Sequence, residues 1–230
     1  MGDYKHMAAG KSDLGTRVAS AIVLFAIAGT ALWLGGIAFG LLLLIGGALV
    51  VVEWFALVRA MGLRGDAKAS FTVLGPIAIL GAMAGLWFIR DHLGLTAALW
   101  VFGMVWATDI GAYFAGRAFG GARLAPKISP SKTWSGLIGG MIAAVIVSAT
   151  VGDRGGIAGV PLWIGLFMGL LAQMGDLGES WMKRRAGVKD SGKLIPGHGG
   201  LFDRVDGLLP VALVLGALAF AGHIAVRAAG

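Results

Sequence analysis

The sequence predicts an all-α integral membrane protein, a polytopic helical bundle of about seven transmembrane helices with its N-terminus in the cytoplasm. The composition is the first reason, because 57% of the 230 residues are hydrophobic and 13% are charged, whereas soluble domains carry about 25% charged residues. The second reason is a series of apolar segments, and the third is an asymmetry of positive charge between the loops that join them. The chain contains no cysteine, which excludes disulfides and thiolate chemistry.

The apolar segments set the number of helices, since a helix needs roughly 20 apolar residues to cross the hydrocarbon core. A tight Gly35-Gly36 turn is expected between the first two. Seven segments qualify, at 18–34, 37–58, 71–89, 95–116, 134–151, 160–182 and 207–226. Glycines four residues apart allow close helix packing in lipid, and such pairs occur at Gly36/Gly40, Gly81/Gly85, Gly136/Gly140 and Gly165/Gly169.

The positive charges orient these helices. With the N-terminus inside, the cytoplasmic segments contain sixteen of the nineteen Lys and Arg, and the outer segments contain only Arg90, Arg154 and Arg227. Such a bias marks the cytoplasmic side, and it explains the basic net charge, so no nucleic-acid partner is expected. Two long polar loops, 117–133 and 183–206, then face the cytoplasm.

The chain divides accordingly into three regions. A cytoplasmic segment occupies 1–17, and its residues 1–7 look like an added expression tag, with the natural start expected at Met7. Helices without a recognisable motif occupy 18–94. The region 95–230 contains both polar loops and is where a site is expected.

Three carboxylates lie at membrane depth within the apolar segments, namely Glu53, Asp109 and Asp176. An ionisable group at membrane depth is expensive and is a functional candidate by default. For Glu53, neutralisation by a partner and a functional role both stay open. Asp109 and Asp176 each lie roughly 10–12 Å along a helix from a basic loop, which favours a site. Gln173, Asp176 and Ser180 share one helix face.

The stretch 180–206 is the densest polar region, with six Lys or Arg and three carboxylates. Asp203 and Asp206 are three residues apart, so they share a face if this part is helical. The His-Gly-Gly run at 198–200 provides a backbone that can approach a ligand closely. These features indicate a binding site more than a plain solvated loop.

The other polar loop ends in Ser129, Ser131, Lys132 and Thr133, which lead directly into the segment that starts at 134. Hydroxyls and free backbone amides at a helix start, beside a lysine, suit a phosphate group. An ordinary helix cap with a cytoplasmic lysine would use the same residues. Composition alone favours this ordinary cap.

The pattern S-x-x-K-R-x4-K-D-x5-P-x-H-G-G-x-x-D-R-x-D in this chain resembles the signature of the phosphatidate cytidylyltransferases, the CDP-diacylglycerol synthases. A second block, 129–134, resembles their S-P-K-K-T-W-E-G run, except that Ser131 replaces a frequent lysine and Ser135 a usual glutamate. The resemblance covers about residues 106–206. The fixed positions of the signature are all present, as Ser180, Lys183, Arg184, Lys189, Asp190, Pro196, His198, Gly199, Gly200, Asp203, Arg204 and Asp206.

The resemblance implies an enzyme that makes CDP-diacylglycerol and pyrophosphate from CTP and phosphatidic acid, with Mg²⁺ as cofactor and a second cation left open. The lipid phosphate is already anionic, so positioning and charge neutralisation are the expected catalytic means. The site would lie at the cytoplasmic face of a bacterial inner membrane, in contact with the bilayer. The glycine-rich faces leave room for a homodimer.

The same resemblance implies the roles of individual residues. Asp176 and Asp203 are expected to bind the metal. The catalytic set is expected to be Asp176, Asp203, Asp206, Lys183 and Arg204. The substrate-binding set is expected to be Asp109, Ser129, Ser131, Lys132, Thr133, Ser180, Arg184, Lys189, Asp190, His198, Gly199 and Gly200.

Two alternatives stay open. CTP-dependent kinases of polyprenyl or phytyl alcohols are membrane proteins with partly similar blocks, and they would transfer the γ-phosphate to an alcohol. A transporter would also carry charges at depth and many glycines. The charges here gather at one face of the membrane, however, and no inverted repeat relates the two halves, which favours an enzyme.

Overall fold

The computed structural model describes residues 12–154, 156–158, 161, 163–195, 197 and 199–226. The predicted tag at 1–7 and two signature residues, Pro196 and His198, lie outside the described residues. The helices are α1 (Ser12–Leu34), α2 (Gly36–Ala60), α3 (Gly65–Phe88), the π-helix η1 (Ile89–Leu93), α4 (Gly94–Phe119), α5 (Trp134–Arg154), α6 (Trp163–Ala186), α7 (Phe202–Val205) and α8 (Leu208–Phe220). The strands are β1 (Arg123–Ala125), β2 (Ser129–Thr133), β3 (Ile157–Ala158) and β4 (Ala225–Val226).

The helical prediction is confirmed, but the chain is not purely α-helical. Gly120 (φ 58°) and Gly121 (φ 96°) end α4 in a conformation that suits glycine. The chain then reverses as an antiparallel hairpin of β1 and β2. Ser129, Ser131 and Lys132 therefore lie on a strand, not at a helix start as predicted. A second pairing, β3 with β4, joins the segment after α5 to the C-terminal end.

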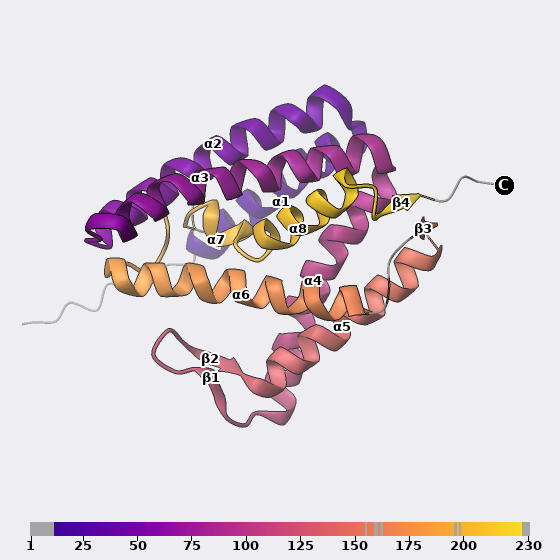
Figure 1. Cartoon of the computed structure of the whole chain (residues 1–230). Helices are drawn as coiled ribbons and strands as arrows, with labels where there is room; N and C mark the ends of the chain where they lie inside the picture. Colours follow the sequence, from indigo (N-terminus) through magenta and orange to yellow (C-terminus); the bar gives the residue numbers. More distant parts are fainter. Residues whose placement is uncertain are drawn as a thin grey trace, which may run out of the picture.

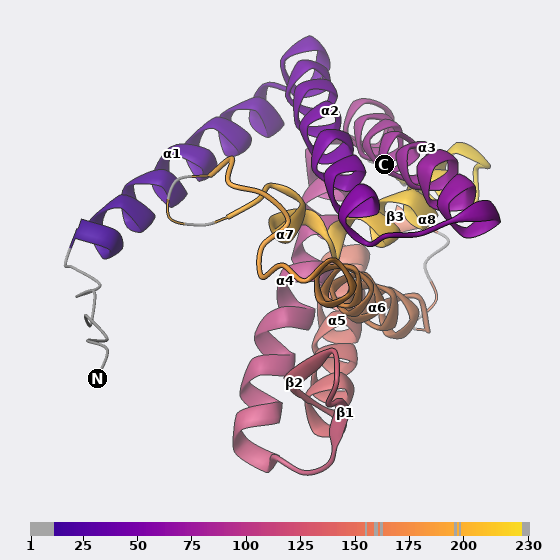
Figure 2. The same cartoon turned by 90° about the vertical axis from the view of Figure 1, so that its left-hand side faces the viewer.

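The helices form two groups. In Figure 1, α2 and α3 run together above α8 and α6, whereas α4 and α5 descend side by side toward the β1–β2 hairpin. The α4–α5 contact is the most extensive helix pairing, followed by α3 on α8. Figure 2 shows that α1 projects away from the other helices and is joined to them at the turn into α2.

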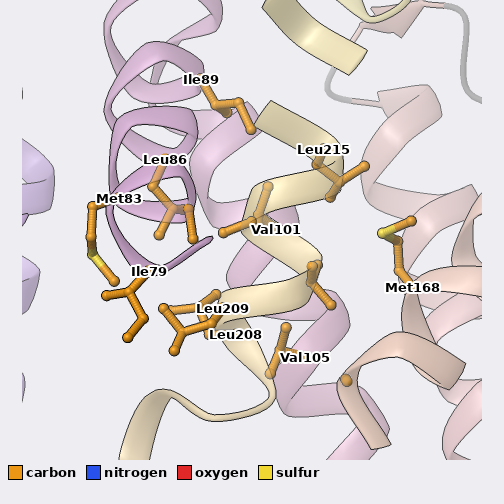
Figure 3. Close-up of a cluster of buried hydrophobic side chains, with 14 of the residues drawn as sticks. Ile79, Met83, Leu86, Ile89, Val101, Val105, Met168, Leu208, Leu209 and Leu215 are labelled. Carbon is orange, nitrogen blue, oxygen red and sulfur yellow. The ribbon is translucent and has the colours of Figure 1, made fainter. Parts of the chain in front are cut away.

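A dry core lies where α3, α4 and α8 meet (Figure 3). Leu86 of α3, Val101 of α4 and Leu215 of α8 are fully buried there. Lipid is as apolar as these side chains, so close van der Waals packing, more than water exclusion, stabilises such a contact. Of the helices in this core, α4 also lines the polar cavity described below.

Glycine gives the closest helix contacts, as predicted. Gly85 of α3 faces Gly216 of α8, and a Cβ on Gly85 would lie 2.8 Å from the Ala212 carbonyl oxygen. Only small residues permit such an approach. The predicted pairs that pack on another helix of this chain are Gly81/Gly85, Gly136/Gly140 and Gly165/Gly169.

The predicted turn between the first two helices is confirmed. Gly35 (φ 67°) and Gly36 (φ 48°) both adopt left-handed conformations. Arg90 of η1 binds the end of α1, because its guanidinium donates to the carbonyl oxygens of Leu32 and Trp33, each at 2.7 Å. The segment around Arg90, predicted to be a loop, is thus a π-helical link between α3 and α4.

Among the described residues, three helical stretches are long and apolar enough to cross a membrane: Gly36–Ala60, Gly65–Phe119 and Trp134–Gly152. The second has 55 residues because η1 joins α3 and α4 without a loop. Shorter apolar helices cover Val18–Leu34 and Leu208–Phe220. The structure thus supports a helical membrane protein, and the count of seven spans stays a prediction.

Candidate active site

A cavity of about 530 Å³ opens between α4, α5, α6 and the β1–β2 hairpin. Its charged lining residues are Asp109, Arg117, Arg123, Lys132 and Asp176. Basic side chains gathered beside carboxylates suit a phosphate compound, because charge-assisted hydrogen bonds to phosphate are strong. Three of these five residues were predicted from the sequence.

Lys132 and Asp176 connect the hairpin to α6. The Lys132 ammonium forms an ion pair with the Asp176 carboxylate and donates to the Gln173 side-chain oxygen at 2.9 Å. The Ser180 hydroxyl donates to the other Asp176 oxygen at 3.3 Å. The predicted shared face of Gln173, Asp176 and Ser180 is therefore confirmed. The Asp176 side chain is still 34% exposed, so it has room for another ligand.

The start of α5 uses the hydroxyl of Thr133 as a cap. The Gly136 amide donates to Thr133 Oγ1 at 3.0 Å, a typical N-cap bond. Ser135, which replaces the glutamate usual in the family, hydrogen-bonds to the Thr133 hydroxyl and donates to the Gly120 carbonyl oxygen. Thr133 thus serves as an ordinary helix cap, one of the two roles considered for it. Ser135 connects the two ends of the hairpin through its bond to Gly120.

A second charge cluster lies about two turns further along α6. The Lys183 ammonium contacts Glu179 Oε2 at 2.5 Å and Asp203 Oδ1 at 2.7 Å. Asp203 also accepts hydrogen bonds from the amides of Ser191, at 3.0 and 3.2 Å, and Gly200, at 2.9 Å. The Glu179 and Asp203 side chains are 1% and 8% exposed. This cluster is closed, and it attaches α7 and the preceding loop to α6.

The pKa values of Asp203 and Asp206 are shifted in opposite directions. Burial raises the pKa of Asp203, but hydrogen bonds with Glu179, Lys183 and the two amides outweigh it and hold this pKa well below its usual range. Burial, and then the charge of Asp176, raise the pKa of Asp206 to about 7. Asp206 thus lies close enough to Asp176 to sense its charge.

The remaining predicted residues are spread around this centre. Arg184 donates to the Ile128 carbonyl oxygen at 3.2 Å and so holds the hairpin against α6. Gly199 (φ 86°) adopts a left-handed conformation and pairs with Ile195. Of the predicted residues that the structure describes, those outside the cavity lining include Ser129, Arg184, Lys189, Asp190 and Arg204. Their binding roles stay predictions.

Sequence reasoning missed part of the cavity wall. Arg117 and Tyr113 are four residues apart on α4, and the Arg117 guanidinium donates to the Tyr113 hydroxyl at 3.1 Å. Both follow Asp109 at helical spacing, and this periodicity was the available signal. Arg123 comes from β1, and only the hairpin places it at the cavity.

The carboxylates near the cavity fit a hard cation such as Mg²⁺. Asp176 and Asp206 offer oxygen ligands, and the charge of Asp176 acts on Asp206. Within the described part of the chain, no three Asp, Glu or His side chains are grouped tightly enough to enclose a metal. Mg²⁺ does not need such a cage, because it usually binds through one or two carboxylates, with water and substrate phosphates completing its shell.

Comparisons with known proteins agree with this geometry. Residues 66–221 match the cytidylyltransferase family. The chain is 38% identical to the phosphatidate cytidylyltransferase of Brucella suis biovar 1 (strain 1330), over 89% of this chain and 92% of that protein. The enzyme of the same name from Rickettsia bellii (strain RML369-C) is 33% identical over 89% of this chain and 90% of its own length. That of Bacillus subtilis (strain 168) is 43% identical over 52% of this chain and 45% of its own length.

Proposed function

This chain belongs to the cytidylyltransferase family, and on that premise we propose that it is a phosphatidate cytidylyltransferase, which makes CDP-diacylglycerol and pyrophosphate from CTP and phosphatidic acid. The observation that carries the proposal is the cavity in which Lys132, Arg117 and Arg123 gather beside Asp176. A site for two phosphate compounds needs this combination of cations and carboxylates.

The reaction needs little covalent help from the protein. An oxygen of the lipid phosphate bonds to the α-phosphorus of CTP, the bond from that phosphorus to the bridging oxygen breaks, and pyrophosphate leaves with the electron pair. The attacking oxygen is anionic at neutral pH, so no protein nucleophile is required. The main obstacle is repulsion between two polyanions, which positioned cations and donors relieve.

The residues of the cavity supply this neutralisation. Lys132, Arg117 and Arg123 provide positive charge for phosphate oxygens, and Arg's planar fork can bind two oxygens at once. Asp176 with Asp206 or Asp203 would hold Mg²⁺. The cation, when bound, offsets negative charge on phosphate oxygens. Asp203 already accepts four hydrogen bonds in the structure, which favours Asp206 as the partner of Asp176.

We place the protein in a bacterial cytoplasmic membrane, with seven spans, the N-terminus inside and the cavity at the cytoplasmic face. The distribution of Lys and Arg supports this orientation. CTP would enter from the aqueous side, and phosphatidic acid would approach from the bilayer. A homodimer and the absence of a nucleic-acid partner stay predictions.

The test is an assay of purified protein with phosphatidic acid, labelled CTP and Mg²⁺, following CDP-diacylglycerol and pyrophosphate. We expect both products in equal amounts and none after chelation of the metal. A parallel reaction with a polyprenol and γ-labelled CTP tests the kinase alternative. Label transfer to the alcohol, without product from phosphatidic acid, would replace our proposal with a kinase.

A further inference from the structure

We propose that Glu53 of α2 is a positioning residue that holds the described parts of the loop before α7, residues 191–195 and 199–201, and with them Asp203, in the active geometry. The kinetic consequence rests on the proposed function, whereas the structural consequence does not. Glu53 lies in the region 18–94, where no motif is recognisable. Its contacts nevertheless reach the signature residues more than a hundred positions later.

Glu53 is bound by both ends of the loop. The Ser191 hydroxyl donates to Glu53 Oε2 at 3.3 Å. The Leu201 amide donates to Oε1 at 3.1 Å and the Phe202 amide to Oε2 at 2.7 Å. The Glu53 side chain is buried. An ionised carboxylate only accepts hydrogen bonds, so these donors meet its requirements without a cation.

The bonds also complete the short helix α7. Leu201 stands at its N-cap position and has no side-chain cap bond, because a leucine has no polar group to offer. Glu53 accepts the free amides at this end, as a capping side chain normally does. The carboxylate that stabilises the start of α7 thus comes from a distant helix.

Glu53 and Asp203 bind the loop from two sides. The Ser191 hydroxyl donates a hydrogen bond to Glu53, and the Ser191 amide donates one to Asp203. The Gly200 amide donates a hydrogen bond to Asp203, and the next two amides, of Leu201 and Phe202, donate to Glu53. The donors to the two carboxylates are therefore the same residue, Ser191, or immediate neighbours in the chain, at 200–202. A shift at Glu53 must therefore move the donors of Asp203 and the Lys183 ion pair that Asp203 forms.

Two glycines make room for this arrangement. A Cβ on Gly200 would lie 2.8 Å from Glu53 Oε2 and 2.7 Å from the Gly192 amide. A Cβ on Gly192 would lie 2.8 Å from the Glu53 carboxyl carbon. Real Cβ atoms do not approach this closely, so the glycines allow the loop to close around the carboxylate. Gly200 belongs to the signature, and the closeness of the Glu53 carboxylate is one reason why a larger residue would not fit at this position.

The test compares Glu53→Gln with Arg90→Gln in detergent. Glutamine keeps the shape but turns one oxygen into an NH₂ group that faces amide donors. Arg90 is the matched control, because its hydrogen bonds hold α1 and do not reach the loop. For Glu53→Gln we expect kcat to fall about 10- to 100-fold, the size of effects from residues that orient a site. The KM for CTP should change little, because Glu53 does not line the cavity.

Limited trypsin digestion provides a readout that does not depend on activity. Lys189 and Lys193 are exposed at the loop, and we expect Glu53→Gln to speed cleavage after them while Arg90→Gln does not. Ser191→Ala, which removes a single donor, should act in the same direction with a smaller effect. It keeps the proposal testable if Glu53→Gln does not fold.

Equal kcat values and equal cleavage rates in the Glu53→Gln and Arg90→Gln proteins would overturn the proposal. So would loss of kcat in both variants in proportion to lost thermal stability, since that indicates a general structural role. If the parent enzyme is inactive, the proposed function fails. The cleavage rates then still decide whether Glu53 holds the loop.

Discussion

The two charge clusters along α6 use the same residue types for different purposes. In the first, Asp176 contacts Lys132 and Ser180 and remains 34% exposed at the cavity. In the second, Asp203 accepts four hydrogen bonds and its side chain is 8% exposed. The carboxylate of the first cluster is exposed enough to bind a ligand, whereas that of the second already accepts hydrogen bonds from protein groups. Residue type alone does not separate an exposed carboxylate at a cavity from one buried among protein donors.

The strongest test of this difference is Asp176→Asn. We expect kcat/KM to fall about 10²- to 10³-fold or more, as when a group that stabilises transition-state charge is removed. Thermal stability should change little, because a partly exposed ion pair contributes only about 0–1 kcal/mol. Activity and the unfolding midpoint are measured on the same preparation. A large loss of stability would contradict the view that this cluster is open.

Asp203→Asn should reduce stability as well as activity. Breaking a buried ion pair costs about 3–5 kcal/mol, because the remaining charge is left without its partner. The unfolding midpoint should fall clearly below that of Asp176→Asn. Asp190→Asn is the stability control, since Asp190 is exposed beside the same loop. If Asp203→Asn unfolds at the parent temperature, the second cluster is not structural.

Lys132→Met should lower kcat/KM about 100-fold, mainly by raising the KM for CTP. The ammonium is the positive charge nearest Asp176 in the cavity, and methionine keeps the length of the side chain without that charge. Initial rates over a range of CTP concentrations measure the effect. An unchanged KM for CTP would move the nucleotide away from the hairpin.

Asp206, and not Asp203, should contribute to the pH dependence of stability between about pH 4 and pH 7. The folded pKa of Asp206 is about 7, above the usual value of about 3.9. Between these values the folded state holds a proton that the unfolded state releases, so stability decreases as pH rises from about 4 to about 7 and then levels off. The folded pKa of Asp203 is lowered, so its contribution is complete above about pH 4.

Thermal unfolding between pH 5 and 8, with a chelator present, measures this effect. Asp206→Asn should reduce the slope, because the amide does not titrate. A slope that is the same in Asp206→Asn as in the parent would contradict this prediction.

The smallest expected effect is that of Ser180→Ala. Its hydrogen bond to the Asp176 carboxylate is long, at 3.3 Å, so we expect it to contribute no more than a typical hydrogen bond, about 0.5–1.5 kcal/mol. We expect at most a roughly tenfold loss of kcat/KM. Gly178→Ala is the matched control, since a Cβ there meets open space. A loss as large as that of Asp176→Asn would make Ser180 a direct substrate ligand.

The spacing of residues along the chain predicted the helices, several helix contacts and one face of the site. The apolar segments predicted helices, the glycine spacing predicted close helix contacts, and the positions of Gln173, Asp176 and Ser180 predicted one shared face. These are properties of neighbouring residues on one helix, where periods of three and four residues set geometry. The signature likewise predicted the family, because its fixed positions lie within one short stretch.

Only the tertiary structure decided how distant residues meet. Lys132 binds Asp176 because a hairpin, not expected from the sequence, returns β2 against α6. Lys183 binds Asp203 across the loop before α7, and Glu53 binds residues nearly 150 positions later. Such pairings depend on how helices pack and loops close, and no local period encodes them. The sequence therefore determined the helices and the chemistry that they carry, while the packing of those helices decided which carboxylate stays exposed at the cavity and which one is buried among protein donors.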